Sequence, residues 1–486
     1  MVSTDFGELG SLQDIEPPEG LMGDIYSYVY HSSPRPVPEV ALTAAIALMA
    51  GVTGRAYNVS NCGLNQYILL LAPTGTGKES LNTGVTTLLH MCEDSIMDSL
   101  SFLGPSDIAS GPALVKHVQE HPSCVSIVGE FGHRLEQLCR GDAVPTEITF
   151  RRMLLDFYSK SGRNAVVNPL VYSKRSDNTA PIRSPSFSLV GESTPGRVYD
   201  NLTTNMVAEG LIPRFMIVEY EGKRPPFNKK HAKVEPDLQL MKGLETMILR
   251  CQQINRQQNM VIDVVIKPDA EQYLDAYDAF CDQKINANKR DTLRQLWNRC
   301  HLKALKLAAL VAVGRSVSEV VDKGYGVTDP TPAITVSDAQ WAVNLVQWST
   351  SHILDKFTSG TLKESKAMER LLFVGELFRN YPSMTLDEAL NDANTTPQFV
   401  QDKILPKNWL FIRCKHKSVF FTPGEKSARW STVKRTMDAL VKEGIIKQLT
   451  RQEITKAGYT LTSHITPIYY RLLDLNKLHE TDFADD

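Results

Sequence analysis

The sequence predicts a mixed α/β core, a helical extension after it and a small carboxyl-terminal domain of the winged-helix type. Three observations carry this prediction. An apolar strand runs directly into a glycine-rich turn near residue 75, helical periodicity dominates residues 238–357, and a basic amphipathic helix precedes two short strands after residue 427. With 486 residues the chain can bury several cores, so roughly two to four domains are expected.

The composition indicates a globular protein. A hydrophobic share of 42% suffices for large cores, and no uninterrupted apolar run is long enough to cross a bilayer. The first 24 positions carry acidic residues where a secretory signal would carry basic ones. We therefore expect a cytoplasmic protein without a membrane partner. The eight cysteines include no Cys-x-x-Cys pair, which favours buried thiols over a zinc site or a disulfide framework.

Residues 67–80 have the layout of a phosphate-binding loop, or P-loop, because an apolar strand leads into two glycines and a lysine. The glycines let backbone N–H groups turn inwards around an anion, and Lys78 can reach the terminal phosphates. The helix that begins near Lys78 points its positive end at the same charge. A glycine turn that binds no nucleotide is the alternative. The predicted nucleotide-binding residues are Pro73, Thr74, Gly75, Thr76, Gly77, Lys78, Glu79 and Ser80.

Two departures from the usual motifs concern a magnesium ion. A P-loop normally has Ser or Thr directly after the lysine to hold Mg²⁺, whereas here Glu79 follows and Ser80 comes one position later. The second motif of such ATPases is an apolar strand ending in Asp-Glu, and here the strand at 125–129 ends in Gly129 and Glu130. Glu130 is predicted to activate the attacking water. We hypothesise that Glu79, with or without Ser80, holds the metal; a site that binds nucleotide without hydrolysing it is the alternative.

Polar residues at two later strands complete the predicted site. The strand at 187–190 leads into Glu192, Ser193 and Thr194, and Ser193 or Thr194 is predicted to sense the terminal phosphate. Arg214 precedes another apolar strand, and is predicted to stabilise charge on the nucleotide of a neighbouring subunit. A structural arginine in an ion pair is the alternative for Arg214.

Two regions supply candidate nucleic-acid contacts. Residues 166–190 are compatible with a hairpin whose tip, at 173–179, carries Lys174 and Arg175, although an exposed loop with solvated charges fits equally well. In the carboxyl-terminal domain, Arg429, Lys434 and Arg435 lie on the helix predicted at 427–443 and are expected to meet DNA phosphates or bases. Winged helices also bind proteins, which is the alternative for this domain.

The elements around these sites follow from periodicity. Helices are predicted at 241–255, 268–287, 291–320 and 337–357, with a strand at 260–266, and the basic residues of the third helix are interpreted as a solvated face. Further helices are predicted at 366–381 and 385–392, and strands at 418–422, 445–448 and 469–473. The side chains predicted to face the core from helix 427–443 are Trp430, Val433, Met437, Leu440 and Val441.

Charge is distributed unevenly along the chain. The formal net charge is -2, but residues 1–34 hold six acids and no Lys or Arg. Residues 407–456 hold twelve Lys and Arg against four acids, a local balance of 12 − 4 = +8. Such separation favours one surface that binds a polyanion.

Taken together, these pieces resemble a family of P-loop ATPases, first catalogued as a domain of unknown function, in phage, plasmid and mobile-element replication proteins. The residues that carry the resemblance lie at 41–47, 54–57, 64–78, 129–132, 210–215 and 302–310. The resemblance implies an α/β P-loop core of the RecA or AAA+ kind, ATP and Mg²⁺ as cofactors, and a ring, such as a hexamer, related to replicative helicases. It also implies the role of an arginine finger for Arg214.

The sequence therefore predicts an ATP-dependent DNA helicase or translocase that works as a ring on single-stranded DNA, with duplex DNA or other replication proteins at the winged helix. Two alternatives are an ATP-gated initiator or helicase loader that binds DNA without unwinding it, and a DNA-stimulated packaging or defence ATPase. The predicted divisions are an irregular amino-terminal arm (1–38) that could dock on a neighbouring subunit, the P-loop core (39–235), a helical extension or lid (236–357), a linker (358–365), the winged-helix-like domain (366–478) and an acidic tail (479–486).

Overall fold

The computed structural model describes residues 6, 15–139, 143–168, 178–200, 202, 206–207, 209–257, 260–323, 331–358, 366–380, 399, 401–421, 427–456, 468–475 and 477. The chain forms two compact units, the first from most of residues 1–363 and the second mainly from residues 364–486. The division falls within the predicted linker, whereas the boundary predicted at 235/236 lies inside the first unit. No helix among the described residues combines the length and the hydrophobicity needed to span a membrane.

The first unit is built on a parallel four-stranded sheet with the order β4–β7–β3–β8. The strands are β3 (Tyr67–Leu71), β4 (Ser123–Val128), β7 (Ser186–Ser193) and β8 (Met216–Glu219). Their near-continuous apolar sequences suit strands that are covered on both faces. Leu71 at the end of β3 lies opposite Ser193 on one side and Glu219 on the other, so the carboxyl ends of three strands meet at one edge. In open parallel sheets that edge is where ligands bind.

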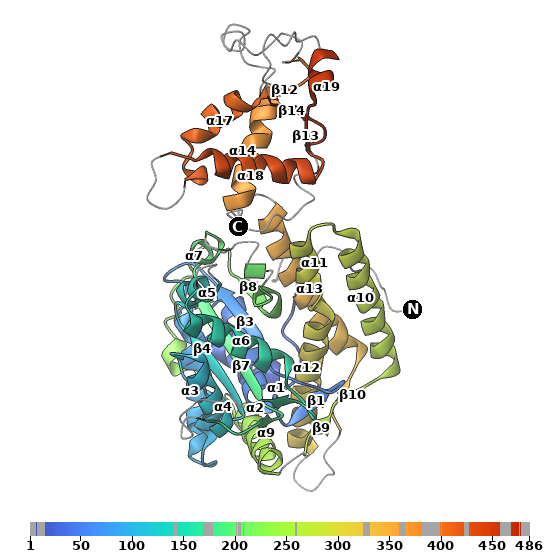
Figure 1. Cartoon of the computed structure of the whole chain (residues 1–486). Helices are drawn as coiled ribbons and strands as arrows, with labels where there is room; N and C mark the ends of the chain where they lie inside the picture. Colours follow the sequence, from blue (N-terminus) through green and yellow to red (C-terminus); the bar gives the residue numbers. More distant parts are fainter. Residues whose placement is uncertain are drawn as a thin grey trace. The chain divides into compact units, whose positions relative to one another are not determined.

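Helices cover both faces of this sheet (Figure 1). On one face lies α2 (Pro38–Thr53), which is apolar all round and is buried from residue 39 to 53. It packs against α1 (Leu21–Ser32), α3 (Glu79–Glu93) and α9 (Leu238–Arg256). On the other face, α5 (Phe131–Cys139) and α6 (Pro145–Ser159) pack on β7, with α4 (Gly111–Glu120) against α6. The short elements around the sheet are β1 (Tyr57–Val59), β2 (Cys62–Gly63), η2 (Ser99–Phe102), β5 (Val166–Val167), β6 (Ile182–Arg183), α7 (Pro195–Tyr199), η4 (Ile212–Arg214) and η5 (His231–Lys233).

The prediction of an irregular amino-terminal arm is wrong for residues 21–32. These residues form α1, whose side chains Leu21, Met22, Ile25 and Val29 are buried in the same core as α2. Farther upstream, the ring of Phe6 lies 5.4 Å from the ring of Tyr273 and 5.3 Å from that of Phe280. The arm thus packs against its own subunit. Its apolar residues have the spacing of a helix, but the prolines nearby obscure that spacing in the sequence.

The helical extension shares its core with the sheet. Its helices are α9, α10 (Pro268–Ala287), α11 (Asp291–Trp297), α12 (Cys300–Lys323) and α13 (Val336–Thr358). The single helix predicted at 291–320 is therefore two helices, separated between Trp297 and Cys300. The strand predicted at 260–266 is also two: β9 (Ile262–Asp263) pairs with β1, and β10 (Val265–Ile266) pairs with β11 (Ala333–Ile334).

The predicted solvated face of α12 is buried at two lysines. Lys303 is 6% exposed and its Nζ donates to the carbonyl oxygen of Phe215 at 2.6 Å. Lys306 is 1% exposed, donates to Oδ1 of Asn65 at 2.7 Å and lies 4.6 Å from the ring centroid of Tyr158. The two lysines connect α12 to the residues just before β8 and β3. Sequence periodicity cannot reveal such contacts. Burial lowers the pKa of each ammonium to about 8.

This burial makes stability depend on pH. Between about pH 8 and 10.5 the unfolded chain binds more protons than the folded one, so the free energy of unfolding rises with pH by at most about 1.4 kcal/mol per unit for each lysine. In Lys306→Met one of these contributions is gone. We expect the stability of wild type relative to Lys306→Met to increase from pH 8 to pH 9.5 in urea titrations. The exposed Lys323→Met is the control, and a difference that does not change with pH would contradict the burial.

The second unit combines helices with a three-stranded antiparallel sheet of order β12–β14–β13. The strands are β12 (Ile404–Pro406), β13 (Ile446–Gln448) and β14 (Tyr469–Leu472), and the helices are α14 (Lys366–Asn380), α17 (Lys407–Lys415), α18 (Trp430–Lys442) and α19 (Arg451–Lys456). The strands predicted at 445–448 and 469–473 are confirmed as β13 and β14, and they pair with each other. The helix predicted at 385–392 and the acidic tail lie outside the described residues.

Two predictions for this unit are wrong. The strand predicted at 418–422 is absent from its described residues, 418–421, because Ser418–Phe420 is a 3-10 helix, η7, in which Phe420 N donates to the carbonyl of Lys417. On α18, Val441 is 36% exposed while Thr436 is buried. The buried stripe follows Val433, Met437 and Leu440, and Val441 lies about 100° beyond Leu440 around the helix axis.

Candidate functional site

The turn between β3 and α3 has the backbone of an anion-binding loop. Gly75 and Gly77 have φ angles of 76° and 95°, which side chains other than glycine rarely adopt. A Cβ on Gly77 would also lie 2.7 Å from the carbonyl oxygen of Arg35, so this position has no room for a side chain. The Nζ of Lys78 donates to the carbonyl oxygens of Ala72 at 2.9 Å and Ser193 at 3.1 Å. Its charge therefore lies at the carboxyl ends of β3 and β7.

Carboxylates from neighbouring strands surround this loop. Glu130 follows β4 and has a left-handed backbone, with φ of 50°, a conformation that costs a non-glycine residue about 1–2 kcal/mol. Glu192 lies opposite Leu70 in the register of β7 and β3. Burial raises the pKa of Glu192 to about 7, Lys78 acts against that rise, and the carboxylates of Glu79 and Glu130 add to it. One lysine and three carboxylates thus share the sheet edge.

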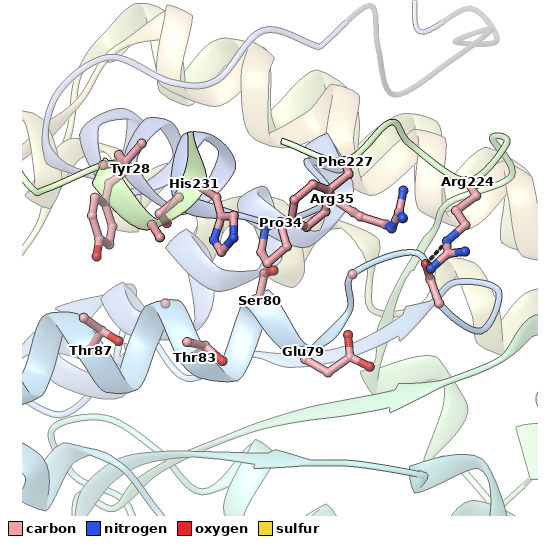
Figure 2. Close-up of a pocket in the computed structure, with 16 residues that line it drawn as sticks. Tyr28, Pro34, Arg35, Glu79, Ser80, Thr83, Thr87, Arg224, Phe227 and His231 are labelled. Carbon is pink, nitrogen blue, oxygen red and sulfur yellow. Dashed lines mark hydrogen bonds between the residues drawn. The ribbon is translucent and has the colours of Figure 1, made fainter. Parts of the chain in front are cut away.

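A pocket of about 620 Å³ opens beside the loop (Figure 2). Its floor is the first two turns of α3, including Glu79, Ser80 and Thr83, and Gly75 and Gly77 form the end next to the loop. Tyr28 lies at the other end, near Thr87, and His231 lies between Tyr28 and Pro34. The volume falls within the range of about 300–1,000 Å³ that is usual for small-molecule sites.

Two segments far apart in sequence form the pocket wall. Asn228 donates from Nδ2 to the carbonyl of His31 at 2.8 Å, and its backbone N–H donates to the carbonyl of Pro34 at 2.9 Å. Arg224 Nε donates to the carbonyl of Gly75 at 2.9 Å, and Arg35 Nη1 donates to the carbonyl of Pro225. Two guanidinium groups therefore stand beside the glycine loop in addition to Lys78.

The sequence interpretation does not foresee this wall. Arg35 falls within the predicted arm, and Arg224 belongs to a segment after β8 for which the sequence predicts no role. One feature of the sequence could have indicated Arg224. It follows Lys223 and lies five residues after the end of a strand that is parallel to β3. Residues after parallel strands meet at the same sheet edge.

No family model matches this sequence, and no curated protein is significantly similar to it.

The predicted phosphate sensors lie beside Lys78 in different ways. The Ser193 side chain is 2% exposed and faces α5, since a Cβ on Gly132 would lie 2.3 Å from its Oγ. Its carbonyl, not its hydroxyl, contacts Lys78. Thr194 precedes α7 and makes no side-chain capping bond. Sensing of a phosphate by Ser193 or Thr194 stays a prediction.

The two residues predicted to hold the metal lie at the start of α3. Glu79 is exposed and Ser80 is 8% exposed, and both line the pocket. Figure 2 shows Ser80 directed towards Pro34 and Glu79 directed away from it. They therefore do not converge on one point in this structure, although Glu79 is close enough to Glu192 to act on its pKa.

Arg214 lies where the sheet strands begin, whereas the glycine loop lies where β3 ends. It ends η4, directly before β8, and Met216 at the start of β8 lies opposite Ile68 at the start of β3. The five residues of β3 separate these strand beginnings from the glycine loop, a distance of about 16 Å. Arg214 donates to the carbonyl of Gly210 and, at 3.2 Å, to Oγ of Ser159. Arg214 is therefore distant from the loop of its own subunit.

The predicted nucleic-acid residues are only partly described. Arg429, Lys434 and Arg435 are exposed, at the start and on the outer face of α18. Lys174 and Arg175 lie outside the described residues, although β5 and β6, which flank them, pair antiparallel as a hairpin requires.

A second polar cluster at the sheet edge is already paired. Glu219, Glu221 and His352 offer ligand atoms within 4.8 Å of one another. However, Lys356 lies 3.0 Å from Glu221, and Glu219 contacts Tyr199 Oη and, at 2.7 Å, His352 Nε2. These contacts connect α13 to β8, and we assign them a structural role.

Proposed function

We propose that this chain binds and hydrolyses ATP at the turn between β3 and α3. The observation that carries the proposal is the convergence of Lys78, Glu130 and Glu192 on a glycine loop at the carboxyl edge of a parallel sheet. Two left-handed glycines allow the loop to turn its N–H groups towards an anion. Lys78 would supply the charge for the phosphates, and Glu130, which follows β4, would take a proton from water.

The pocket beside the loop suits the nucleoside. Triphosphate oxygens at Gly75 to Lys78 would leave the ribose and base in the space between α1 and α3. The ring of Phe227, over which Arg35 lies at 5.9 Å, and the rings of Tyr28 and His231 offer flat surfaces for a base. Arg35 and Arg224 add positive charge where the phosphates leave the loop. When bound, Mg²⁺ would neutralise phosphate charge next to the carboxylates.

Lys78→Ala is expected to weaken ATP binding about 10- to 150-fold, since a hydrogen bond to a charged group is worth about 1.5–3 kcal/mol. Isothermal titration of the full chain with ATP and Mg²⁺ measures this change. Lys116→Ala removes an exposed lysine of α4 and is the control. Equal affinity of Lys78→Ala and wild type would place the nucleotide elsewhere.

We further infer that the ATPase acts on DNA as a ring translocase or helicase. The exposed bases of α18 and the helix-and-hairpin organisation of the second unit support contact with a phosphate backbone. The distance between Arg214 and its own loop supports an arginine that acts on a neighbouring subunit. An ATP-gated initiator or loader is the second candidate, and the glycine at 129 favours it because slow hydrolysis suffices for gating.

Strand displacement separates these two functions. A forked duplex that is unwound with ATP, but not with a non-hydrolysable analogue, supports the motor. DNA binding with either nucleotide and no unwinding supports the loader. Absence of DNA binding under both conditions would exclude both.

Replacing Arg429, Lys434 and Arg435 by alanine together is expected to weaken duplex DNA binding. The slope of log affinity against log salt should become shallower by about 0.9 for each DNA phosphate that the variant no longer neutralises. Fluorescence anisotropy at several salt concentrations measures both effects, with Lys442→Ala at the far end of α18 as control. An unchanged slope would remove α18 from the DNA interface.

A further inference from the structure

Gly129, near the glycine loop, occupies the position where the second motif of P-loop ATPases has a metal-assisting aspartate. An ideal Cβ built on Gly129 meets no atom within 4 Å. The φ angle of Gly129 is not in the left-handed region, so the backbone there does not require glycine. Gly129 is exposed, so this space is open to solvent and has room for a side chain.

Strand register places Glu192 beside this space. Ile127 and Val190 are register partners, and both side chains face the core shared with α2 and α3. Side chains alternate along a strand, so Glu192 is directed to the same face as Val190. Gly129 directly follows the last register pair, Val128 and Gly191, and so lies at the strand end next to Glu192. On its other side Glu192 lies opposite Leu70, which precedes the glycine loop.

The side chain of Glu192 has no protein partner for one oxygen. Its Oε1 is buried and makes no hydrogen bond. A buried carboxylate oxygen without a donor is costly unless a cation or a water occupies the position. Lys78 is the cation that lowers the pKa of Glu192, but its ammonium group donates to the carbonyl oxygens of Ala72 and Ser193.

We propose that Glu192 supplies the carboxylate that position 129 lacks, and helps to hold the Mg²⁺ of a bound Mg–nucleoside triphosphate as a ligand or through one of the metal's waters. The proposal rests on the proposed nucleotide site. It differs from the assignment to Glu79 and Ser80, because the metal-binding carboxylate belongs to β7, the strand between β3 and β4, and not to the start of α3. Carboxylate oxygens beside substrate phosphates are the ligands that Mg²⁺ prefers.

The test measures metal binding without turnover. For the full chain, the affinity for a fluorescent ATP analogue is titrated with Mg²⁺ and in EDTA, and bound Mn²⁺ is counted by electron paramagnetic resonance in the presence of ATP. In Glu192→Gln the affinity for the divalent ion should fall about 10- to 100-fold, the size usual when a supporting group of a metal site is lost. The affinity for the analogue in EDTA should be unchanged or tighter, since one negative charge is gone.

A second variant distinguishes this role from a structural one. Glu192→Gln combined with Gly129→Asp places a carboxylate in the open space and should restore Mg²⁺ dependence. Glu93→Gln, at the far end of α3 and about 21 Å along the helix axis from Glu79, is the control. Wild-type metal affinity in Glu192→Gln, or failure of Gly129→Asp to restore it, would overturn the proposal. Loss of nucleotide binding by wild type in both Mg²⁺ and EDTA would instead overturn the proposed function.

Discussion

Glu130→Gln is expected to lower the rate of ATP hydrolysis about 10²- to 10⁴-fold, the usual contribution of a positioned general base. The amide is nearly the size of the carboxylate but cannot take a proton from water. ATP affinity should stay close to that of wild type, because the proposed phosphate contacts come from Lys78 and the glycine loop and not from Glu130. Single-turnover hydrolysis together with ATP titration separates the two effects.

Two further variants show whether the loss of activity comes from the missing carboxylate. Glu120→Gln, at the end of α4, is an exposed control for the loss of one charge. Glu130→Gly removes the carboxylate and also the left-handed strain, so it should be as inactive as Glu130→Gln without being less stable. If Glu130→Gln hydrolyses ATP at the wild-type rate, another group activates the water.

Arg214→Ala is expected to lower turnover about 10³-fold or more, as removal of an arginine finger does, with little change in ATP affinity. The expectation depends on geometry, because the length of β3 separates Arg214 from the loop of its own subunit. An effect on catalysis therefore requires a second subunit. Steady-state ATPase rates at protein concentrations that permit assembly measure the change, with Arg183→Ala on β6 as control.

Mixing two inactive variants tests whether Arg214 acts between subunits. Arg214→Ala retains Lys78, and Lys78→Ala retains Arg214, so an interface between the two variants holds one complete site. We expect the mixture to regain ATPase activity that neither variant has alone. A mixture without activity, from variants that still assemble, would leave Arg214 with a structural role on Gly210 and Ser159.

The local elements around the candidate site could be predicted because their signals are local. An apolar run followed by glycines and a lysine specifies a strand, a left-handed turn and a helix start within residues 67–80, and the structure has β3, the turn and α3 there. The position of Glu130 after β4 and the existence of the short strands β13 and β14 depend on a few adjacent residues in the same way. Helix ends were less predictable, as the division between α11 and α12 shows.

The neighbours of those elements could not be predicted, because they depend on which segments pack together. Arg35 and Arg224 reach the glycine loop only because residues 31–34 and 228 are hydrogen bonded to each other. Lys303 and Lys306 look like an ordinary basic face in the sequence, and only the packing of α12 on the strand beginnings buries them.

Single stretches of sequence are enough to identify the chemical groups: a glycine loop with a lysine, a carboxylate after one strand, an arginine before another and a basic helix near the end. Which of these groups lie close together follows from the packing of the whole sheet. The order β4–β7–β3–β8 brings Glu192 between Gly129 and the loop and holds Arg214 at the far edge. Strand order and register are set by the burial of whole faces of the sheet, a long-range property that no short stretch of residues encodes.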